Sequence, residues 1–163
     1  MGQNSLRRGR YSSPGSTYFL TFCTEHRAVG LDKLYALLHG QALTLESQNV
    51  WVVHSQVVMP DHEHLIVILH EDADLPAAVR LYRGRTSVAL RTAGLRWQRG
   101  YFDHCLRPDE DRLPVFLYLY LNPYRADLLP VSAKWDGYYC RAEDWAWFSP
   151  LTNEGCPMPE WLA

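Results

Sequence analysis

Alternation of apolar and polar positions predicts three strands in the first half of the chain. Bulky side chains alternate with small or polar ones over Thr17–Cys23, and β-branched and aromatic residues fill positions 50–58. A third run, 62–70, opens with two histidines and continues with apolar residues. The short turn at 59–61 joins the last two runs, so we expect them to form an antiparallel hairpin.

Helical spacing of apolar positions predicts the first two helices. Leucines and one tyrosine recur at helical intervals over residues 31–43. Asp74 is a suitable N-cap, Pro76 suits a first turn, and Gly94 follows the last periodic position, Thr92. We therefore expect the second helix to run from about residue 74 to Thr92.

The rest of the pattern completes a fold class. Residues 97–106 are predicted to form a fourth strand, with Gly100 at a bulge or close approach. A third helix is expected from the acidic, proline-containing stretch 108–111 through the apolar run 113–120. This order predicts an α+β fold of the ferredoxin-like or RRM-like kind, an antiparallel sheet with helices packed on one face and the histidines on a central strand.

Length and composition indicate one soluble domain. The chain has 163 residues, 47% of them hydrophobic, which is enough to bury a core. We expect one domain over residues 1–163, with a core at about 15–130 and an aromatic-rich segment, 131–163, wrapped around it. The four cysteines form no CxxC pair, which argues against a zinc ribbon or a disulfide framework. Without a bilayer-length apolar run or a secretory h-region, the sequence predicts a cytoplasmic protein.

Arginine is concentrated in one part of the chain. Seven arginines and no lysine lie from Arg80 to Arg107, where Asp103 is the only acid. Arginine binds phosphate through planar, bidentate contacts and stacks on bases, so this block is a candidate polyanion-binding surface. A solvated helix face explains the same charge equally well.

His62 and His64 are the candidate metal ligands. In an extended strand, side chains two positions apart share a face, so both imidazoles can converge on one ion while Glu63 points to the other face. Two nitrogen ligands leave room for oxygen ligands and water, as an open catalytic site requires. Two polar residues on a half-exposed face would give the same pattern.

Tyr118 and Asn122 form a second candidate group. If the third helix reaches Asn122, the two side chains lie on the same side, one turn apart. A tyrosine can form a covalent intermediate, and a nearby cation polarises the phosphate that it attacks. Tyr120 is the rival nucleophile, about 200° around the helix from Tyr118. Alternatively, both tyrosines are core residues of an amphipathic helix.

Three ordered motifs resemble the single-tyrosine HUH transposases, most closely the REP-associated tyrosine transposase branch. Residues 58–67 (VMPDHEHLIV) are similar to the family segment VMPNHxHLLV, and residues 97–107 (WQRGYFDHCLR) to its WQ…FDHxLR. Residues 118–126 (YLYLNPYRA) are similar to YIxxNPVRA. With the first predicted strand, the resemblance covers about residues 15–130.

The resemblance implies a metal-dependent endonuclease and strand transferase for single-stranded DNA, with a 5′-phosphotyrosine intermediate. By position, His62 and His64 would bind Mg²⁺ or Mn²⁺, Asn122 would be a third ligand or an orienting group, and Tyr118 would be the nucleophile. The substrate would be hairpin DNA of the REP kind with single-stranded flanks, and the protein a monomer or a homodimer. Candidate DNA contacts in the arginine block are Arg80, Arg83, Arg85 and Arg99.

Three positions depart from the family pattern. Glu63 replaces a bulky hydrophobic residue, Asp61 a common asparagine, and Tyr120 a frequent histidine. These departures raise a second hypothesis, a domesticated protein that binds hairpin DNA without cleaving it. A metal-assisted phosphoesterase for small molecules is a third, although it leaves the arginine block unexplained. His104 suits either an approach to the site or a polar position at a strand end.

Overall fold

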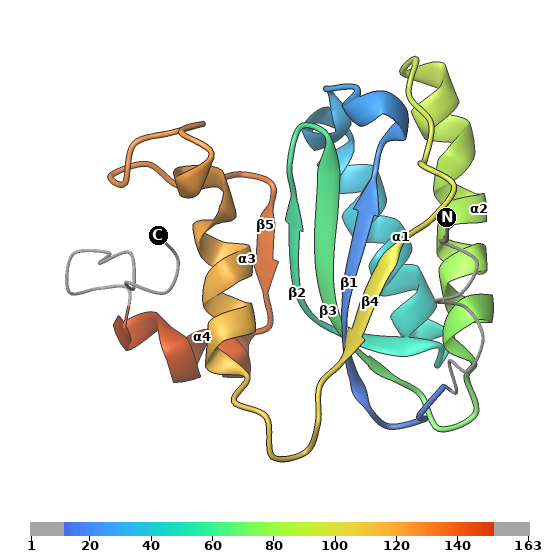
Figure 1. Cartoon of the computed structure of the whole chain (residues 1–163), viewed down its shortest axis with the longest axis vertical. Coiled ribbons are helices and arrows are strands. Elements are labelled where there is room, and N and C mark those ends of the chain that lie inside the picture. Colours follow the sequence, from blue (N-terminus) through green and yellow to red (C-terminus); the bar gives the residue numbers. More distant parts are fainter. Residues whose placement is uncertain (1–11, 152–163) are drawn as a thin grey trace, which may run out of the picture.

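The computed structural model describes residues 12–151 and contains the predicted order of strands and helices, extended at its end (Figure 1). The elements are β1 (Thr17–Cys23), η1 (Glu25–Arg27), η2 (Leu31–Leu34), α1 (Tyr35–Ser47), β2 (Trp51–Val58), β3 (His62–Leu69), α2 (Leu75–Thr92), β4 (Phe102–Cys105), α3 (Leu113–Arg125), β5 (Tyr138–Cys140), α4 (Ala142–Phe148) and η3 (Ser149–Leu151). No helix in the described part is both long and apolar enough to cross a lipid bilayer.

The five strands form one antiparallel sheet in the order β4-β1-β3-β2-β5. The predicted α+β class is therefore confirmed. β3 is the central strand and begins at His62. Its register with β1 places Thr21 opposite His64, and its register with β2 places Val57 opposite the same residue.

Helices lie on both faces of the sheet, which corrects the prediction that they pack on one. α1 and α2 cover one face, where their apolar side chains pack against Leu20, Leu65 and Val67 in one core. α3 and α4 pack against Val57 and Ile66 in a second core on the opposite face (Figure 1). The apolar side of α3 must be buried against another surface. The face of β2 and β3 that α1 and α2 leave uncovered provides this surface.

Local signals account for the bounds of the two longer helices. The Asp74 side chain accepts a hydrogen bond from the backbone N–H of Ala77, so α2 is capped as predicted. Gly94 follows α2 with a φ of 75°, a conformation that glycine adopts readily. Pro114 lies in the first turn of α3, and the helix continues through Pro123 to Arg125.

The predicted strand at 97–106 is shorter in the structure. β4 begins only at Phe102, and Trp97 forms an isolated bridge with Thr24. The backbone carbonyls of Gln98 and Gly100 accept hydrogen bonds from the Arg83 side chain instead of from a neighbouring strand. A side chain from α2 therefore occupies acceptors that a continuous strand would have used.

The aromatic segment after residue 130 contains a fifth strand, β5, and a fourth helix, α4. β5 pairs with β2 at the edge of the sheet, and α4 packs against α3. The indole N–H of Trp135 donates to the carbonyl of Val58, which fixes the connection beside the end of β2. The last part of this segment, 152–163, lies outside the described residues.

Candidate active site

β3 presents its two histidines on the face of the sheet that α3 covers. Leu65 and Val67 belong to the core beneath α1 and α2, whereas Ile66 belongs to the core beneath α3. His62 and His64 share the face of Ile66, and their ring centroids are 4.8 Å apart. The predicted pair of neighbouring imidazoles is therefore present.

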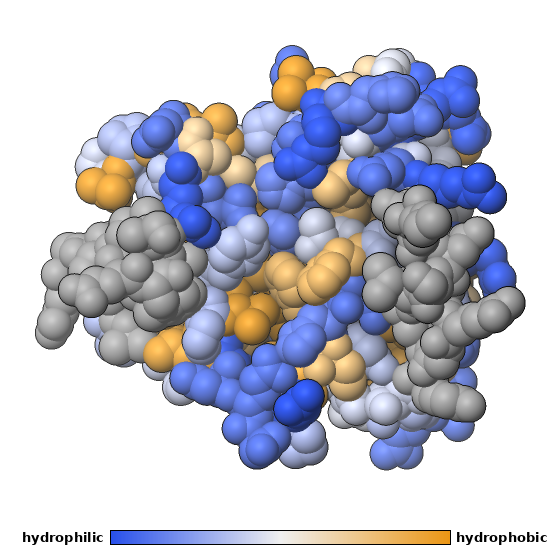
Figure 2. Space-filling view, viewed as in Figure 1, coloured by the Kyte–Doolittle hydropathy of each residue, from blue (hydrophilic) through white to orange (hydrophobic). Residues whose placement is uncertain are grey.

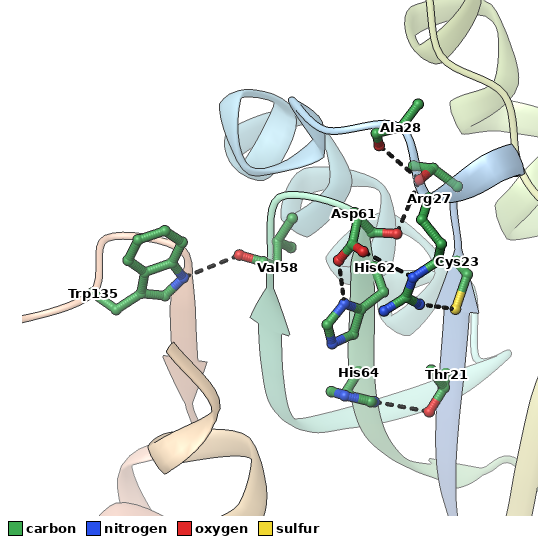
Figure 3. A network of polar contacts seen from close by, with 10 residues as sticks. Thr21, Cys23, Arg27, Ala28, Val58, Asp61, His62, His64 and Trp135 are labelled. Carbon is green, nitrogen blue, oxygen red and sulfur yellow. Dashed lines mark hydrogen bonds and ion pairs between the residues drawn. The ribbon is translucent and has the colours of Figure 1, made fainter. Parts of the chain in front are cut away.

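Hydrogen bonds engage the same nitrogen, Nδ1, on both rings. Nδ1 of His64 is 2.8 Å from Oγ1 of Thr21, and Nδ1 of His62 is 2.6 Å from Oδ1 of Asp61 (Figure 3). Nε2 of His64 is buried and has no hydrogen-bond partner among the described residues. Because a buried polar atom without a partner is unfavourable, this nitrogen is a candidate for binding a ligand.

The environment of His64 favours its neutral form. Burial lowers the pKa of His64 well below its usual value, and the nearby His62 and Arg27 lower it further. A neutral imidazole carries a lone pair on one ring nitrogen, which is the form that binds a metal ion. The chemical state of His64 therefore suits a ligand role.

Asp61 connects His62 to a cation. One carboxylate oxygen contacts the His62 ring, and the other lies 2.8 Å from Nε of Arg27 (Figure 3). A carboxylate that accepts a hydrogen bond from a metal-binding histidine orients the ring and raises its basicity. Asp61 can supply this support, and Arg27 offsets its charge.

Tyr118 projects from α3 toward the histidines. Its ring centroid is 5.2 Å from that of His64 and 6.1 Å from that of Phe19. The guanidinium carbon of Arg125 lies 5.8 Å from the centre of the Tyr118 ring. The predicted nucleophile and one predicted metal ligand are thus adjacent.

Tyr120 faces a different part of the molecule. Its ring lies against those of Tyr138 and Trp145, at centroid distances of 5.4 and 5.5 Å. These contacts belong to the aromatic cluster formed by α3, β5 and α4. The geometry therefore favours Tyr118 over Tyr120 as the residue that meets the histidines.

The residues present fit an open metal site. Within residues 12–151, no group of three or more histidine, cysteine, aspartate or glutamate side chains is arranged to hold an ion. Asn122 is buried one turn beyond Tyr118 on α3, but no hydrogen bond joins its amide to either imidazole among the described residues. An ion bound to His62 and His64 would therefore take its other ligands from water, substrate or a shifted Asn122.

Glu63 points to the opposite face, as the alternation of the strand predicts. Its side chain is fully buried, and Oε2 accepts hydrogen bonds of 3.1 Å from both Gln56 and Tyr82. Burial raises the pKa of Glu63 to about 7, although the two hydrogen bonds oppose this rise. Glu63 is thus part of the core beneath α2 and does not reach the histidines.

β4 extends the histidine face towards solvent. Thr21 pairs with both His64 and Phe102, so these residues stand in one row across three strands. Phe102 is 55% exposed, although it is a large apolar residue. Figure 2 shows apolar surface between α3 and β4, with hydrophilic surface around it. His104 is on the same face, where Nε2 contacts Glu110 at 2.8 Å.

The arginine block forms a groove on the other side of the sheet. The groove has a volume of about 760 Å³ and is lined by α2 and the segment that precedes β4. Its polar and aromatic lining includes Arg80, Arg83, Arg91, Arg96, Arg99, Trp97 and Tyr101. Arg83 donates to the backbone carbonyls of Gln98 and Gly100. Within residues 12–151, the other four arginines form no ion pair, so their positive charge is not neutralised locally.

Curated proteins and solved structures of one kind are similar to this chain. The REP-associated tyrosine transposase of Escherichia coli K12 is 25% identical over 128 residues, which cover 77% of each chain. A Haemophilus influenzae protein provisionally given the same name is 28% identical over 48% of this chain and 52% of its own. No protein-family model matches the chain.

The similar solved structures are also of proteins described as transposases. A REP-associated tyrosine transposase bound to a REP hairpin superposes with a TM-score of 0.63 and 24% identity, over 74% of this chain and 73% of that one. The predicted resemblance to the REP-associated tyrosine transposases is confirmed. A Deinococcus radiodurans protein provisionally described as a transposase has a TM-score of 0.52 and 20% identity, over 71% and 95% of the two chains.

The residues predicted from the likeness to REP-associated tyrosine transposases fall into two groups. His62, His64 and Tyr118 come together on one face of the sheet, with Asn122 one helical turn away. The predicted DNA contacts lie behind the sheet: Arg80, Arg83 and Arg99 line the groove, and Arg85 is exposed on α2 outside it.

Sequence reasoning missed several residues that complete the site. Thr21 and Arg27 come from the first part of the chain, and their contacts with His64 and Asp61 depend on strand register. Arg125 lies inside the third motif, seven residues after Tyr118, and this interval of about two helical turns could have indicated it. Asp61 could have been found as a carboxylate adjacent to a candidate metal ligand.

Proposed function

We propose that this protein is a metal-dependent nuclease and strand transferase that acts on single-stranded DNA beside a hairpin. Tyr118 is the nucleophile, and His62 and His64 bind Mg²⁺ or Mn²⁺. The similarity to REP-associated tyrosine transposases supports this class of reaction. The geometry supports it independently, because a tyrosine and two histidines from distant segments meet on one face.

The observation that carries the proposal is Nε2 of His64, which is buried without a partner next to Tyr118. With Nδ1 engaged by Thr21, Nε2 is the nitrogen left to bind an ion. A bound divalent ion would polarise the phosphate and offset charge on the departing oxygen. Asp61 contacts Nδ1 of His62 and so leaves Nε2 of that ring to bind the same ion.

The residues of this chain orient the reactants. The α3 helix holds the Tyr118 ring against His64 and Phe19, so the phenol is presented from one fixed direction. Attack by its oxygen on phosphorus would form a 5′-phosphotyrosine bond and break the bond from phosphorus to the 3′ oxygen. The phenol loses one proton and the departing 3′ oxygen gains one to leave as a hydroxyl. Arg125, beside the Tyr118 ring, would attract the negatively charged phosphate to this position.

The groove behind the sheet is the proposed hairpin-binding surface. Its arginines would contact duplex phosphates, and such contacts give affinity without sequence preference. A single-stranded flank would then pass around the edge strand β4 to reach the histidine face. Phe102, exposed on that face, offers a surface for stacking an unpaired base.

A covalent adduct tests the proposed reaction. The protein is incubated with DNA hairpins that carry unpaired nucleotides on both sides, in Mg²⁺ or Mn²⁺, and adducts are resolved on denaturing gels and mapped by mass spectrometry. We expect an adduct on Tyr118 that is absent in EDTA and in Tyr118→Phe. An adduct that survives in Tyr118→Phe would overturn the assignment.

Tyr120→Phe is the matched control, because it removes a phenol two residues away that packs elsewhere. The adduct should form in this variant at nearly the wild-type rate. Arg80→Ala and Arg99→Ala test the groove: both should weaken hairpin binding and reduce its salt dependence by roughly one ion each. If neither substitution changes the salt dependence of hairpin binding, the hairpin binds outside this groove.

A second candidate function is binding of hairpin DNA without cleavage. The position of the groove favours it, since arginines on the far side of the sheet can bind a hairpin without help from the histidines. Binding that survives His62→Ala, together with no adduct in any divalent ion, would support this alternative over the nuclease.

A further inference from the structure

We propose that Arg27 binds the phosphate group that Tyr118 attacks, through the guanidinium N–H groups that its protein contacts leave available. This inference rests on the proposed function, because it assigns a further substrate contact to the same site. Arg27 lies outside all three transposase-like motifs, in the short η1 segment after β1.

Two protein contacts hold the Arg27 guanidinium at the histidine pair. Nε lies 2.8 Å from Oδ2 of Asp61, whose other oxygen contacts His62, and Nη1 lies 2.9 Å from Sγ of Cys23. Figure 3 shows the guanidinium group between the Asp61–His62 pair and Cys23. Nη2 has no partner among the described residues, and the side chain is 54% exposed. The guanidinium group is therefore held in place and retains N–H groups that can donate to a phosphate.

The backbone at Arg27 adopts a conformation that non-glycine residues seldom use. His26 and Arg27 both have a φ of 55°, in the left-handed region. Such strain persists only where the surroundings impose it, and it is concentrated at functional sites. Glycine would relieve it, but glycine cannot provide a guanidinium group.

The buried residue Thr24 imposes this conformation. Its hydroxyl lies 2.7 Å from the carbonyl oxygen of Ala28 and 3.0 Å from that of Asp61, and its backbone N–H donates to Asp61 at 2.9 Å. The turn that carries Arg27 is thus tied directly to the residue before the histidine strand. A shift of this turn relative to Asp61 would break these bonds.

The chemistry of the proposed reaction requires positive charge at this place. Attack on a phosphodiester places negative charge on the non-bridging oxygens, and arginine donors aimed at these oxygens stabilise it. A planar guanidinium can contact a carboxylate along one edge and a phosphate along another. Asp61 would hold one edge of Arg27 while the phosphate takes the other.

The test measures DNA binding without cleavage, in the Tyr118→Phe background. Hairpins with flanks on both sides carry one uncharged methylphosphonate linkage, moved one position at a time, and affinity is measured by fluorescence anisotropy. With Arg27 present, we expect one linkage in the single-stranded flanks, outside the duplex that the groove contacts, whose neutralisation weakens binding roughly tenfold. In Arg27→Gly, the same neutralisation should change affinity less than about twofold.

Arg27→Gly is chosen because glycine accepts the φ of 55°, so the variant should fold with a melting temperature no lower than that of the parent. Arg27→Lys retains the charge and should recover part of the position-dependent penalty. Arg112→Ala is the matched control, because it removes an exposed arginine at the start of α3. It should leave the position-dependent penalty intact.

The outcomes separate this inference from the proposed function. A penalty that persists in Arg27→Gly, or a scan in which no linkage shows one, overturns the role of Arg27 even if the wild-type protein forms the Tyr118 adduct. A penalty that depends on Arg27 in a protein that forms no adduct supports the phosphate contact and contradicts the nuclease.

Discussion

Two neighbouring polar residues of β3, Glu63 and His64, lie on opposite faces of the sheet in different surroundings. Glu63 lies in a closed core, where Gln56 and Tyr82 hydrogen-bond to Oε2, while Oε1 is buried without a partner among the described residues. His64, one residue later, is almost as deeply buried, and its Nε2 likewise has no partner, but the rings of His62 and Tyr118 lie beside it. One face contains a polar network that belongs to the core, whereas the other contains a group suited to bind something else. Burial alone therefore does not distinguish a structural polar residue from a functional one.

The largest effect is expected from His64→Leu, which removes the unpartnered nitrogen and introduces an apolar side chain of similar size. Affinity for Mn²⁺ should fall roughly a hundredfold or more, since half of the histidine pair is lost. The free energy of unfolding should change by less than about 1 kcal/mol, because the lost contact with Thr21 is offset by removal of a buried polar atom. Isothermal titration with Mn²⁺ and urea unfolding measure the two quantities. A large loss of stability with unchanged Mn²⁺ affinity would assign His64 to the core.

Glu63→Gln tests the other face through its pH dependence. The pKa of Glu63, raised by burial to about 7, exceeds the usual value of 4.5, so the folded protein retains a proton that the unfolded chain has lost. This contribution is fully present below about pH 4.5 and is lost as pH rises to about 7. Glutamine does not titrate, so the variant should match the wild type near pH 4.5 and exceed its stability at pH 8 by up to about 3 kcal/mol.

Urea unfolding in EDTA at both pH values measures this difference. His64 is present in both proteins, so its own titration cancels in the comparison. Mn²⁺ affinity measured separately should differ by less than about twofold, because Glu63 faces away from the histidines. A stability difference independent of pH would contradict the raised pKa of Glu63.

Thr21→Val gives a smaller effect on the histidine face. The methyl group replaces the hydroxyl that contacts Nδ1 of His64, so the ring loses its orienting partner. We expect Mn²⁺ affinity to fall about tenfold, and Thr21→Ser to restore most of it. Equal affinities of the valine and serine variants would show that the hydroxyl does not orient the ring.

The smallest effect is expected from Asp61→Asn, which restores the residue common in similar transposases. An asparagine oxygen still accepts a hydrogen bond from Nδ1 of His62, so Mn²⁺ affinity should change by only roughly threefold. The ion pair with Arg27 is partly exposed, and its loss should alter stability by less than about 1 kcal/mol. A loss comparable with that in His64→Leu would mean that the carboxylate itself binds the ion.

Local patterns predicted the parts of this fold that depend on neighbours in sequence. Alternation located β1 and β3 and placed Glu63 opposite the histidines, because side-chain direction in a strand is set by period two. Capping and proline signals located α2, and the four-residue interval placed Tyr118 and Asn122 on one side of α3.

Long-range packing determined what these patterns could not predict. Which face of the sheet α3 covers, and hence that Tyr118 meets His64, depends on the core with Val57 and Ile66. The partner of His64, Thr21, is 43 residues earlier in the chain and is fixed only by the register of β1 with β3. The order of residues in the chain also does not reveal that the arginine groove lies on the face of the sheet opposite the histidines.

The central position of β3 has a consequence for motion. Strands β1 and β2 bond to it along nearly its whole length, so its amide hydrogens should exchange with solvent only when the sheet opens. Tyr118 stands on a helix that reaches the sheet through side chains alone. The histidine pair is thus held rigidly by the sheet. We expect that any movement that accommodates the proposed DNA substrate occurs in α3, which carries Tyr118.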